Sequence, residues 1–311
     1  MLSPLQSPPV SVAVWIRDRP QRGALGALPG TVDLHLIPQD GELPREVRDA
    51  EFLVPPYGSQ DLLEMLGEMP HLAVVQAASA GTDWLAPWVP DGVELCSARG
   101  TRDTAVAEWV LAAILAMEKQ LPDLARAQSE QAWRPTMLGE LAGRRVLIVG
   151  YGSIGQRLAN MLRALGVTVE GVASTARDDI HGVEELPQLL PSADIVVLLV
   201  PLTQQTRRLF DARMLSWMRS GALLVNAARG AILDTESLVE HLQSGRLRAA
   251  LDVTDPEPLP RDHPLWGAPG VMITPHLAGD SPEAEERVYG FIGEQIRRYV
   301  NGEPLLNVVD S

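Results

Sequence analysis

The chain has 311 residues, 46% of them hydrophobic and 21% charged, which is typical of a globular protein with about two domains. The formal net charge of −14 disfavours a nucleic-acid partner, and the single cysteine, Cys96, excludes disulfide frameworks within the chain and cysteine-based zinc sites. We therefore expect no metal ion. The sequence has neither a long uncharged apolar stretch nor a basic leader before an apolar run, so we expect no membrane span, no secretory signal and a cytoplasmic location.

The first 98 residues alternate between short apolar runs and amphipathic stretches. We expect a helix at 60–67 and strands at 12–16, 32–37, 52–54, 72–77 and 93–97. Strands that alternate with helices predict a parallel sheet covered on both faces, and therefore an α/β domain. The last amphipathic helix, at 281–300, has no strand of its own, so we expect it to pack on this first block.

A long helix rich in alanine, leucine and valine is expected at 101–120, and a second set of strands follows it. These strands are expected at 145–149, 167–172, 195–200, 223–227, 249–253 and 271–274. Their near-continuous apolar runs are typical of a parallel sheet that is buried on both faces. We expect this second block to be a doubly wound nucleotide-binding domain.

A glycine-rich loop, Gly150-Tyr151-Gly152-Ser153-Ile154-Gly155, follows the strand at 145–149 and leads into an expected helix at 154–165. In this setting the G-x-G-x-x-G pattern predicts a dinucleotide site. The first glycine permits a tight turn, the second lets the backbone approach a pyrophosphate, and the third lets helix and strand pack closely. The helix N-terminus then offers N–H groups to the phosphates.

The turn after the next strand bears on the choice between NADP(H) and NAD(H). NAD-selective proteins place an acidic residue about 18 residues after the last glycine, and that position is Ala173 here. Glu170 lies too early in its strand to replace that acid. The turn instead offers two hydroxyls and a guanidinium, which suit a 2′-phosphate, on Ser174, Thr175 and Arg177. We therefore expect NADP(H) to be preferred, with NAD(H) as the alternative in which Arg177 only faces solvent.

Three polar segments, 226–230, 251–258 and 274–279, each follow a strand of the second block. Ligands of doubly wound sheets bind beyond the carboxyl ends of the strands, so the three segments can converge on one site. An arginine, glutamate or histidine taken singly is usually a surface ion pair, a solvated loop residue or a core residue. The residues of these types in the three segments are Arg229, Glu257 and His276, and it is their occurrence together in the order of a known family that favours a catalytic site.

With these motifs the chain resembles the D-isomer-specific 2-hydroxyacid dehydrogenase family, in particular its glyoxylate and hydroxypyruvate reductases. Further matching motifs lie at Ser79-Ala80-Gly81 with Asp83, at 104–108, at 141–143, and at Pro201 with Thr203 and Thr206. The resemblance implies two doubly wound parallel-sheet domains. These are a Rossmann NAD(P)-binding domain of residues 99–279 and a smaller flavodoxin-like substrate domain of residues 1–98 with 280–311. It also implies a homodimer.

The resemblance assigns catalysis to Arg229, Glu257 and His276. The planar fork of Arg229 would hold the carboxylate of a small 2-keto acid. His276 would donate a proton to the keto oxygen as hydride arrives from the nicotinamide, and in the reverse direction the neutral imidazole would be the base. Glu257 would hold the other ring nitrogen and keep the protonated form of His276 available.

The remaining contacts that the resemblance implies are to the cofactor and the substrate. Asp252 is assigned to the nicotinamide carboxamide. The other cofactor contacts would come from the glycine loop, from the turn that carries Arg177, and from Pro201, Thr206, Ala227, Ala228, Arg229, His276, Ala278 and Gly279. The substrate contacts would come from Tyr57, Ser79, Ala80, Gly81 and Arg229, with Trp84 and Trp266 as further candidate pocket walls.

Among enzymes, reduction of glyoxylate or hydroxypyruvate fits an NADP-type turn best. A phosphoglycerate dehydrogenase is a weaker alternative, because the chain stops near Ser311 without room for an appended regulatory domain. Formate oxidation is disfavoured because the family's formate enzymes lack a glutamate at the position of Glu257. A non-catalytic dinucleotide-sensing regulator of the same fold is a further alternative, against which the three catalytic residue types argue.

Overall fold

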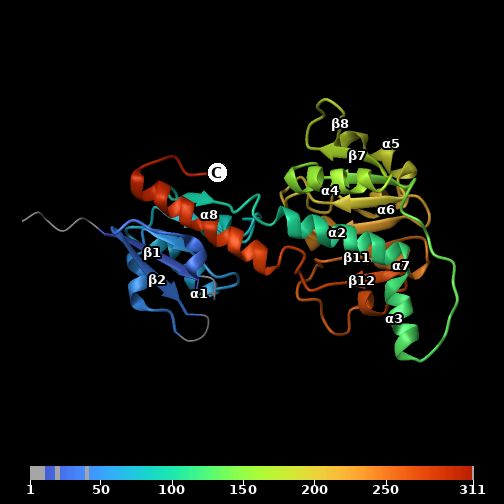
Figure 1. Ribbon diagram of the computed structural model, residues 1–311, viewed down its shortest axis with the longest axis horizontal. Helices are drawn as coiled ribbons and strands as arrows, with labels where there is room; N and C mark the ends of the chain where they lie inside the picture. Colours follow the sequence, from blue (N-terminus) through green and yellow to red (C-terminus); the bar gives the residue numbers. More distant parts are fainter. Residues whose placement is uncertain (1–10, 18–21, 39–41, 310–311) are drawn as a thin grey trace, which may run out of the picture. The chain divides into compact units, whose positions relative to one another are not determined.

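The computed structural model describes residues 11–17, 22–38 and 42–309, and these form two compact units. The first unit contains the described residues up to Arg102 and from Ser281 onward, and the second contains Asp103–Asp280. Each unit is built on one parallel sheet (Figure 1), as the α/β prediction requires. No helix in the described part of the chain is long and apolar enough to cross a membrane.

The first unit has a five-stranded sheet in the order β2-β1-β3-β4-β5, and every neighbouring pair in it is parallel. Its strands are β1 (Val12–Arg17), β2 (Val32–Ile37), β3 (Phe52–Val54), β4 (Val74–Gln76) and β5 (Glu94–Cys96). This order is the flavodoxin-like one, so the expected fold of the smaller domain is confirmed.

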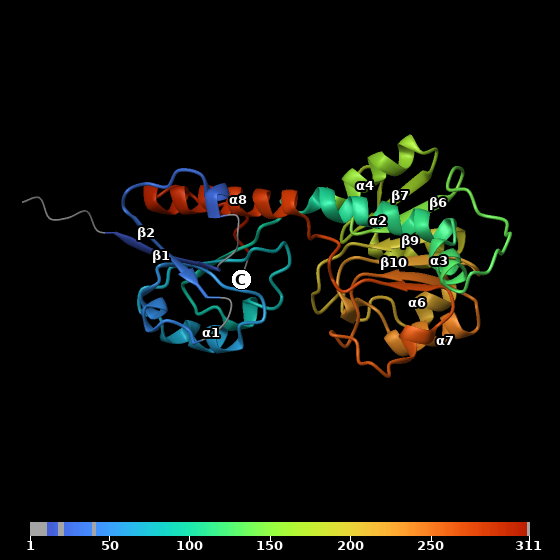
Figure 2. The same ribbon diagram turned by 60° about the horizontal axis from the view of Figure 1, so that its bottom comes forward.

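Successive side chains of these strands point to opposite faces of the sheet, and each face has its own apolar cluster. Val14 and Phe52 face α8 (Pro282–Asn301), which buries Val288, Tyr289, Ile292 and Ile296 against them. The neighbouring residues Trp15 and Leu53 pack instead with Leu62 and Leu63 of α1 (Gln60–Met65). Figure 2 shows α8 and α1 on opposite sides of the sheet. The C-terminal helix therefore does pack on the first block, as its lack of a partner strand predicts.

The second unit has a seven-stranded sheet in the order β12-β11-β10-β9-β6-β7-β8, again parallel throughout. Its strands are β6 (Arg145–Val149), β7 (Thr168–Ala173), β8 (Ile180–Gly182), β9 (Ile195–Leu198), β10 (Leu223–Asn226), β11 (Arg248–Leu251) and β12 (Val271–Ile273). The chain reverses direction across the sheet between β6 and β9, which is the switch point of a Rossmann fold. The short edge strand β8 is absent from the sequence-based expectation.

Helices cover both faces of this second sheet. On one face, α2 (Asp103–Glu118) and α4 (Ser153–Ala164) share an apolar cluster with Val146 and Ile148. On the other face, Leu147 and Val149 belong to a cluster with residues of three further helices, α5 (Leu186–Leu189), α6 (Ala212–Trp217) and α7 (Thr235–Gln243). Figure 2 shows the two groups of helices on either side of the strands.

The long helix expected at 101–120 is shorter than predicted and is followed by a second helix. It ends at Glu118, because Gln120 adopts a left-handed conformation with φ of 51° that an α-helix cannot contain. The chain then continues as α3 (Leu121–Ser129), with a proline in its first turn. Short 3-10 helices occupy other connections, at Arg22–Leu25, Arg45–Asp49, Leu66–Glu68, Ala86–Trp88, Val183–Glu185, Leu190–Ser192, Gly230–Ile232 and Pro264–Gly267.

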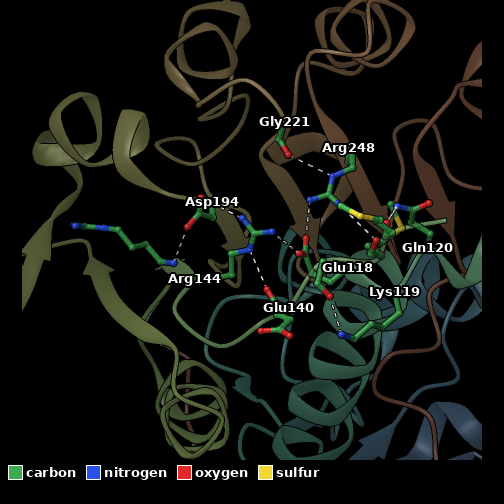
Figure 3. Close-up of polar contacts among 12 residues, drawn as sticks. Glu118, Lys119, Gln120, Glu140, Arg144, Asp194, Gly221 and Arg248 are labelled. Atoms are coloured by element: carbon green, nitrogen blue, oxygen red, sulfur yellow. Dashed lines mark hydrogen bonds and ion pairs between the residues drawn. The ribbon is translucent and has the colours of Figure 1, made fainter.

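An ionic network fastens the end of α2 to the strand starts, along what we call the amino edge of the second sheet (Figure 3). The Glu118 carboxylate, 2% exposed, accepts from Arg144 at 3.1 Å and from Arg248 at 2.7 Å. Arg248 also donates to the carbonyls of Met117 and Gly221, at 3.2 and 3.3 Å. Since Arg248 opens β11 and Arg144 directly precedes β6, the network ties α2 to two strands at once.

Candidate active site

The glycine loop lies at the opposite, carboxyl edge of the second sheet, between the end of β6 and the start of α4. Gly150 has φ of +105°, and a Cβ there would lie 2.5 Å from the carbonyl carbon of Leu199, so only glycine fits between the two strand ends. A Cβ on Gly155 would lie 2.7 Å from the Gly150 carbonyl oxygen. A Cβ on Gly152 would meet no atom within 4 Å, so its backbone is open to a ligand. The loop thus has the geometry that a bound pyrophosphate requires.

Tyr151, inside the loop, is a core residue whose backbone N–H and carbonyl are both hydrogen-bonded. Its ring is 8% exposed and fills the space beside Gly171 of β7, where an added Cβ would overlap it. Its N–H donates to the carbonyl of Val172 at 3.0 Å. Its own carbonyl accepts from the Arg177 guanidinium at 3.4 Å. The side chain therefore supports the loop from beneath.

The turn predicted to read the ribose follows β7, whose last residue is Ala173. Ser174, Thr175 and Arg177 are all exposed in this turn. The bond from Arg177 to Tyr151 brings the guanidinium beside the glycine loop. Glu170 is ion-paired with Arg145 at 3.1 Å, so it is engaged away from the turn. The turn therefore places the Arg177 guanidinium, and not the Glu170 carboxylate, beside the glycine loop.

A short loop after β9 lies next to the glycine loop, because Gly150 packs against the backbone of Leu199 and Val200. The Thr206 hydroxyl donates to the Pro201 carbonyl at 2.6 Å and accepts from the Thr203 N–H at 2.8 Å. These bonds close the loop into a compact turn beside the predicted dinucleotide site.

The turn after β10 carries Ala227, Ala228 and Arg229, and the side chain of Asn226 closes it. One guanidinium nitrogen of Arg229 donates to the Ala228 carbonyl at 2.8 Å. Gly230 follows, and a Cβ there would overlap the carbonyl of Thr254. This close approach holds the Arg229 turn against the loop after β11, which carries Glu257.

Glu257 and His276, which the family resemblance pairs as acid-base residues, are in direct contact. His276 Nδ1 lies 2.6 Å from Glu257 Oε1, and the two side chains are 34% and 36% exposed. His276 has φ of 54°, an uncommon conformation that its N–H secures by donating to the Asp252 carbonyl at 2.7 Å. Because Glu257 holds Nδ1, Nε2 is the ring nitrogen through which a proton can pass to a substrate.

Asp252 is 2% exposed, and its carboxylate organises the loop that carries His276. It accepts from the Thr274 hydroxyl at 2.6 Å and from the N–H groups of Leu277 and Ala278 at 2.9 and 2.8 Å. A carboxylate has about four acceptor sites, so three donors leave one for a further partner such as a carboxamide. The structure therefore gives Asp252 a positioning role in addition to the cofactor contact that the resemblance implies.

The three loops meet because their strands are neighbours in matching register. Asn226 of β10 pairs with Leu251 of β11, which pairs with Ile273 of β12, so all three strands end at one level. The Asp252 N–H donates to the Asn226 carbonyl at 3.0 Å and links the first two loops. Ala278 and Gly279 extend the third loop from the same edge. The candidate catalytic residues and the glycine loop therefore lie along one edge of one sheet.

The substrate candidates of the first unit also gather at strand ends. Tyr57 follows β3, and the segment Ser79-Ala80-Gly81 follows the neighbouring strand β4. Trp84 joins them: its ring meets that of Tyr57 edge-on at 4.9 Å, and its N–H donates to the Ser79 hydroxyl at 3.4 Å. Tyr57 is 65% exposed. Trp266 belongs to the second unit, where its N–H donates to the carbonyl of Pro260 at 2.8 Å.

A cavity of about 360 Å³ lies at the amino edge, but it has none of the predicted site residues in its lining. Its charged groups Glu118, Arg144 and Arg248 are bonded to one another, and Asp123 is paired with Arg126. Within the ranges that the structure describes, no three His, Cys, Asp or Glu side chains are grouped so that they could hold a metal ion. The predicted site residues of the second unit lie at the carboxyl edge instead.

Three residues that sequence reasoning left without a role support this edge: Asn226, Gly230 and Thr274. Each lies in one of the segments 226–230 and 274–279, so its position at or just after the end of a strand is a sequence signal that could have identified it. Their specific partners are Arg229, Thr254 and Asp252. The Gly230–Thr254 and Thr274–Asp252 contacts join different loops, which the spacing of residues along the chain does not reveal, whereas the Asn226–Arg229 bond lies within one turn.

A Rossmann sheet, with a glycine loop at its switch point and an acid-base pair at the same edge, defines a dinucleotide-dependent oxidoreductase. Residues 111–278, more than half of the chain, match the family described as D-isomer specific 2-hydroxyacid dehydrogenase, NAD binding domain. The chain belongs to this family of NAD(P)-dependent oxidoreductases.

Several proteins are similar to most of the chain. A glyoxylate reductase from Thermofilum pendens is 32% identical over 86% of this chain and 83% of its own length. A D-3-phosphoglycerate dehydrogenase from Methanocaldococcus jannaschii is 30% identical over 86% of this chain but 53% of its own, so the chain spans about half that relative's length. The crystal structure of an NADPH-dependent glyoxylate/hydroxypyruvate reductase from Sinorhizobium meliloti, in complex with NADP and sulfate, has a TM-score of 0.82. It is 28% identical and covers 96% of this chain and 98% of that one.

Proposed function

We propose that the chain is a reductase of small 2-keto acids, with glyoxylate or hydroxypyruvate as substrate and NADP(H) as the preferred cofactor. The observation that carries the proposal is the 2.6 Å contact between His276 Nδ1 and Glu257, on the sheet edge that also carries the glycine loop. A glutamate that accepts from Nδ1 fixes the orientation of the imidazole and leaves Nε2 as the ring nitrogen that can donate a proton to a substrate.

The residues of the carboxyl edge then have distinct tasks. The nicotinamide supplies the hydride. His276 gives the proton on Nε2 to the keto oxygen, and Arg229 binds the neighbouring carboxylate through its guanidinium. Asp252 fixes the His276 loop with three hydrogen bonds. On the first unit, Tyr57 and the segment Ser79-Ala80-Gly81 are proposed to contact the substrate, the latter through its backbone N–H groups.

The preference for NADP(H) rests on Ala173 and Arg177. Ala173 cannot accept a hydrogen bond from a ribose 2′-hydroxyl through its side chain, whereas Arg177, held beside the glycine loop, can pair with a 2′-phosphate. Arg177→Ala is expected to raise the Kd for NADPH by about tenfold or more, as the loss of a charge-assisted contact predicts, and to leave the Kd for NADH nearly unchanged. Arg163→Ala, an exposed arginine near the other end of α4, is the matched control. Equal effects of Arg177→Ala on both cofactors would contradict the assignment.

One assay, the consumption of reduced cofactor with a panel of keto acids, distinguishes the proposed function from two alternatives. The similarity to phosphoglycerate dehydrogenases favours a phosphorylated hydroxy acid, and the dinucleotide-binding sheet alone would suit a non-catalytic sensor. Consumption of NADPH and of NADH is to be measured with glyoxylate, hydroxypyruvate, pyruvate and phosphohydroxypyruvate. We expect the highest kcat/KM with one of the first two and NADPH. Cofactor binding without turnover on any of the four would refute the reductase proposal.

We also propose that the chain is a homodimer, as the family resemblance implies. Light scattering coupled to size-exclusion chromatography measures the mass in solution. A mass near twice the chain's 33.7 kDa is expected, and a mass near 33.7 kDa across the concentration range would contradict it.

A further inference from the structure

The side chain of Asn226 is fully buried at the carboxyl edge, as the last residue of β10. A buried primary amide is costly unless both its oxygen and its nitrogen have hydrogen-bond partners. Asn226 satisfies both within the next three residues, so its side chain serves the turn that carries Arg229.

The two ends of the amide bind two successive parts of that turn. The oxygen, Oδ1, accepts from the Ala228 N–H at 3.1 Å, and the nitrogen, Nδ2, donates to the Arg229 carbonyl at 2.9 Å. One bond needs an acceptor and the other needs a donor. Among side chains of this size, only the amide offers both at this separation.

The backbone of Asn226 connects the same turn to the His276 loop. Its carbonyl accepts from the Asp252 N–H at 3.0 Å, and the Asp252 carbonyl accepts from the His276 N–H at 2.7 Å. A chain of three hydrogen bonds thus runs from the carbonyl of Arg229, through Asn226 and Asp252, to the N–H of His276. A shift of the Asn226 amide would move Arg229 relative to the histidine.

We propose that Asn226 is a positioning residue that sets the Arg229 guanidinium for the substrate carboxylate. This inference rests on the proposed function, because it assumes that Arg229 binds a carboxylate. Asn226→Asp has nearly the same shape but replaces the donor with a carboxylate oxygen that faces the Arg229 carbonyl. Asn226→Ala removes both bonds without adding charge, and it serves as the second variant if the aspartate impairs folding.

The test distinguishes an effect on the position of Arg229 from effects on folding and on cofactor binding. We expect KM for glyoxylate and the Kd of oxalate, a non-reducible carboxylate probe, to rise about tenfold or more in both variants, because small displacements of a binding group are costly. The Kd for NADPH should change by less than about threefold. Rates are divided by the measured number of NADPH-binding sites, so that each variant is judged on its folded fraction.

Glu118→Gln is the matched control, since it also alters a buried polar side chain of the second unit but lies at the amino edge. It should leave KM for glyoxylate and the Kd of oxalate unchanged. The proposal is overturned if the Asn226 variants keep the wild-type KM and oxalate Kd and lose only folded fraction. If the wild type reduces no keto acid, the proposed function fails instead, and the oxalate Kd still reports whether Asn226 sets Arg229.

Discussion

The second unit has a buried carboxylate at each edge of its sheet, and the two are bound in different ways. Glu118, at the amino edge, accepts from two guanidinium groups, those of Arg144 and Arg248. Asp252, at the carboxyl edge, accepts only from neutral donors, which all belong to the loop that carries His276. Both side chains are nearly inaccessible to solvent, so burial does not distinguish them.

This difference in hydrogen-bond partners distinguishes an edge where charged side chains stabilise the fold from an edge where they remain available for chemistry. At the amino edge the charged groups neutralise one another, and a ligand would have to displace existing ion pairs. At the carboxyl edge the buried carboxylate orders a loop, and the side chains of the His276–Glu257 pair in the neighbouring loops are each about a third exposed. A cavity whose charged side chains are already paired with one another is therefore a poorer guide to function than a partly exposed His–Glu pair in which one ring nitrogen has no role in the pairing.

The largest effect should come from the half-exposed pair. His276→Ala removes the proton donor, and kcat for keto-acid reduction is expected to fall by about 10²–10⁴-fold. The Kd for NADPH should stay near the wild-type value, because the glycine loop and Arg177 are untouched. Steady-state kinetics and fluorescence titration measure the two quantities. A variant that turns over at the wild-type rate would remove His276 from the mechanism.

The next effect should come from the close contact between two loops of the carboxyl edge. Gly230→Ala places a methyl group against the carbonyl of Thr254, so the Arg229 and Glu257 loops must separate. We expect kcat/KM to fall by about 10²-fold. Gly267→Ala, where an added Cβ meets no atom within 4 Å, is the control and should be nearly neutral. Equal kinetics for the two variants would show that the contact does not shape the site.

At the amino edge the expected effect is on stability alone. Glu118→Ala leaves two guanidinium groups without their partner. Arg144 and Arg248 are 37% and 32% exposed, so water can solvate them in part, and we expect a loss of about 2 kcal/mol. Urea denaturation measures the free energy of unfolding, and kcat/KM at a temperature well below the transition should be unchanged. A large fall in kcat/KM of the folded variant would contradict this prediction, because it would show that the amino edge affects catalysis at the carboxyl edge.

The smallest effect should come from Asp234, which caps α7 by accepting from the Ser237 N–H at 3.1 Å. Partial burial raises the pKa of this carboxyl, but the Ser237 N–H and the Arg208 guanidinium lower it more, so the net shift is downward. A lowered pKa means that the ionised group stabilises the fold near neutral pH, and that this contribution is lost as the pH falls through the acidic range.

Asp234→Ala should therefore cost about 1 kcal/mol near neutral pH. The difference in unfolding free energy between wild type and variant should shrink on acidification. A difference that grows as the pH falls would contradict the assigned direction of the pKa shift. The Kd for NADPH serves as a control and should not change.

The sequence predicts the sheets better than their connections. Apolar runs mark eleven of the twelve strands that the described residues form, because burial on both faces imposes a continuous hydrophobic pattern. The strand β8 was missed because it has three residues, one of them a histidine. The sequence analysis does not predict the helix α3, which starts directly after Gln120. The left-handed conformation of Gln120 separates it from α2, and a glutamine gives no sequence signal for that conformation.

In the candidate site, likewise, the sequence predicts the residues better than the contacts between them. The glycine loop and the order of Arg229, Glu257 and His276 are visible in the sequence, since each follows a strand directly. The bonds of Asn226 to the Arg229 turn are local and depend on the conformation of that turn, whereas the contact of Gly230 with Thr254 depends on which loops become neighbours across the sheet. That neighbourhood is set by strand order, which spacing along the chain does not determine.

A single-turnover experiment tests the central claim most directly. The wild type, His276→Ala and Glu118→Ala proteins are each loaded with NADPH and mixed with excess glyoxylate or hydroxypyruvate, and the nicotinamide absorbance is followed in time. We predict rapid oxidation of all bound NADPH by the wild type and by Glu118→Ala, and oxidation slower by about 10²-fold or more in His276→Ala. Bound NADPH that persists in the wild type with both keto acids would contradict the proposed reductase activity of the carboxyl edge.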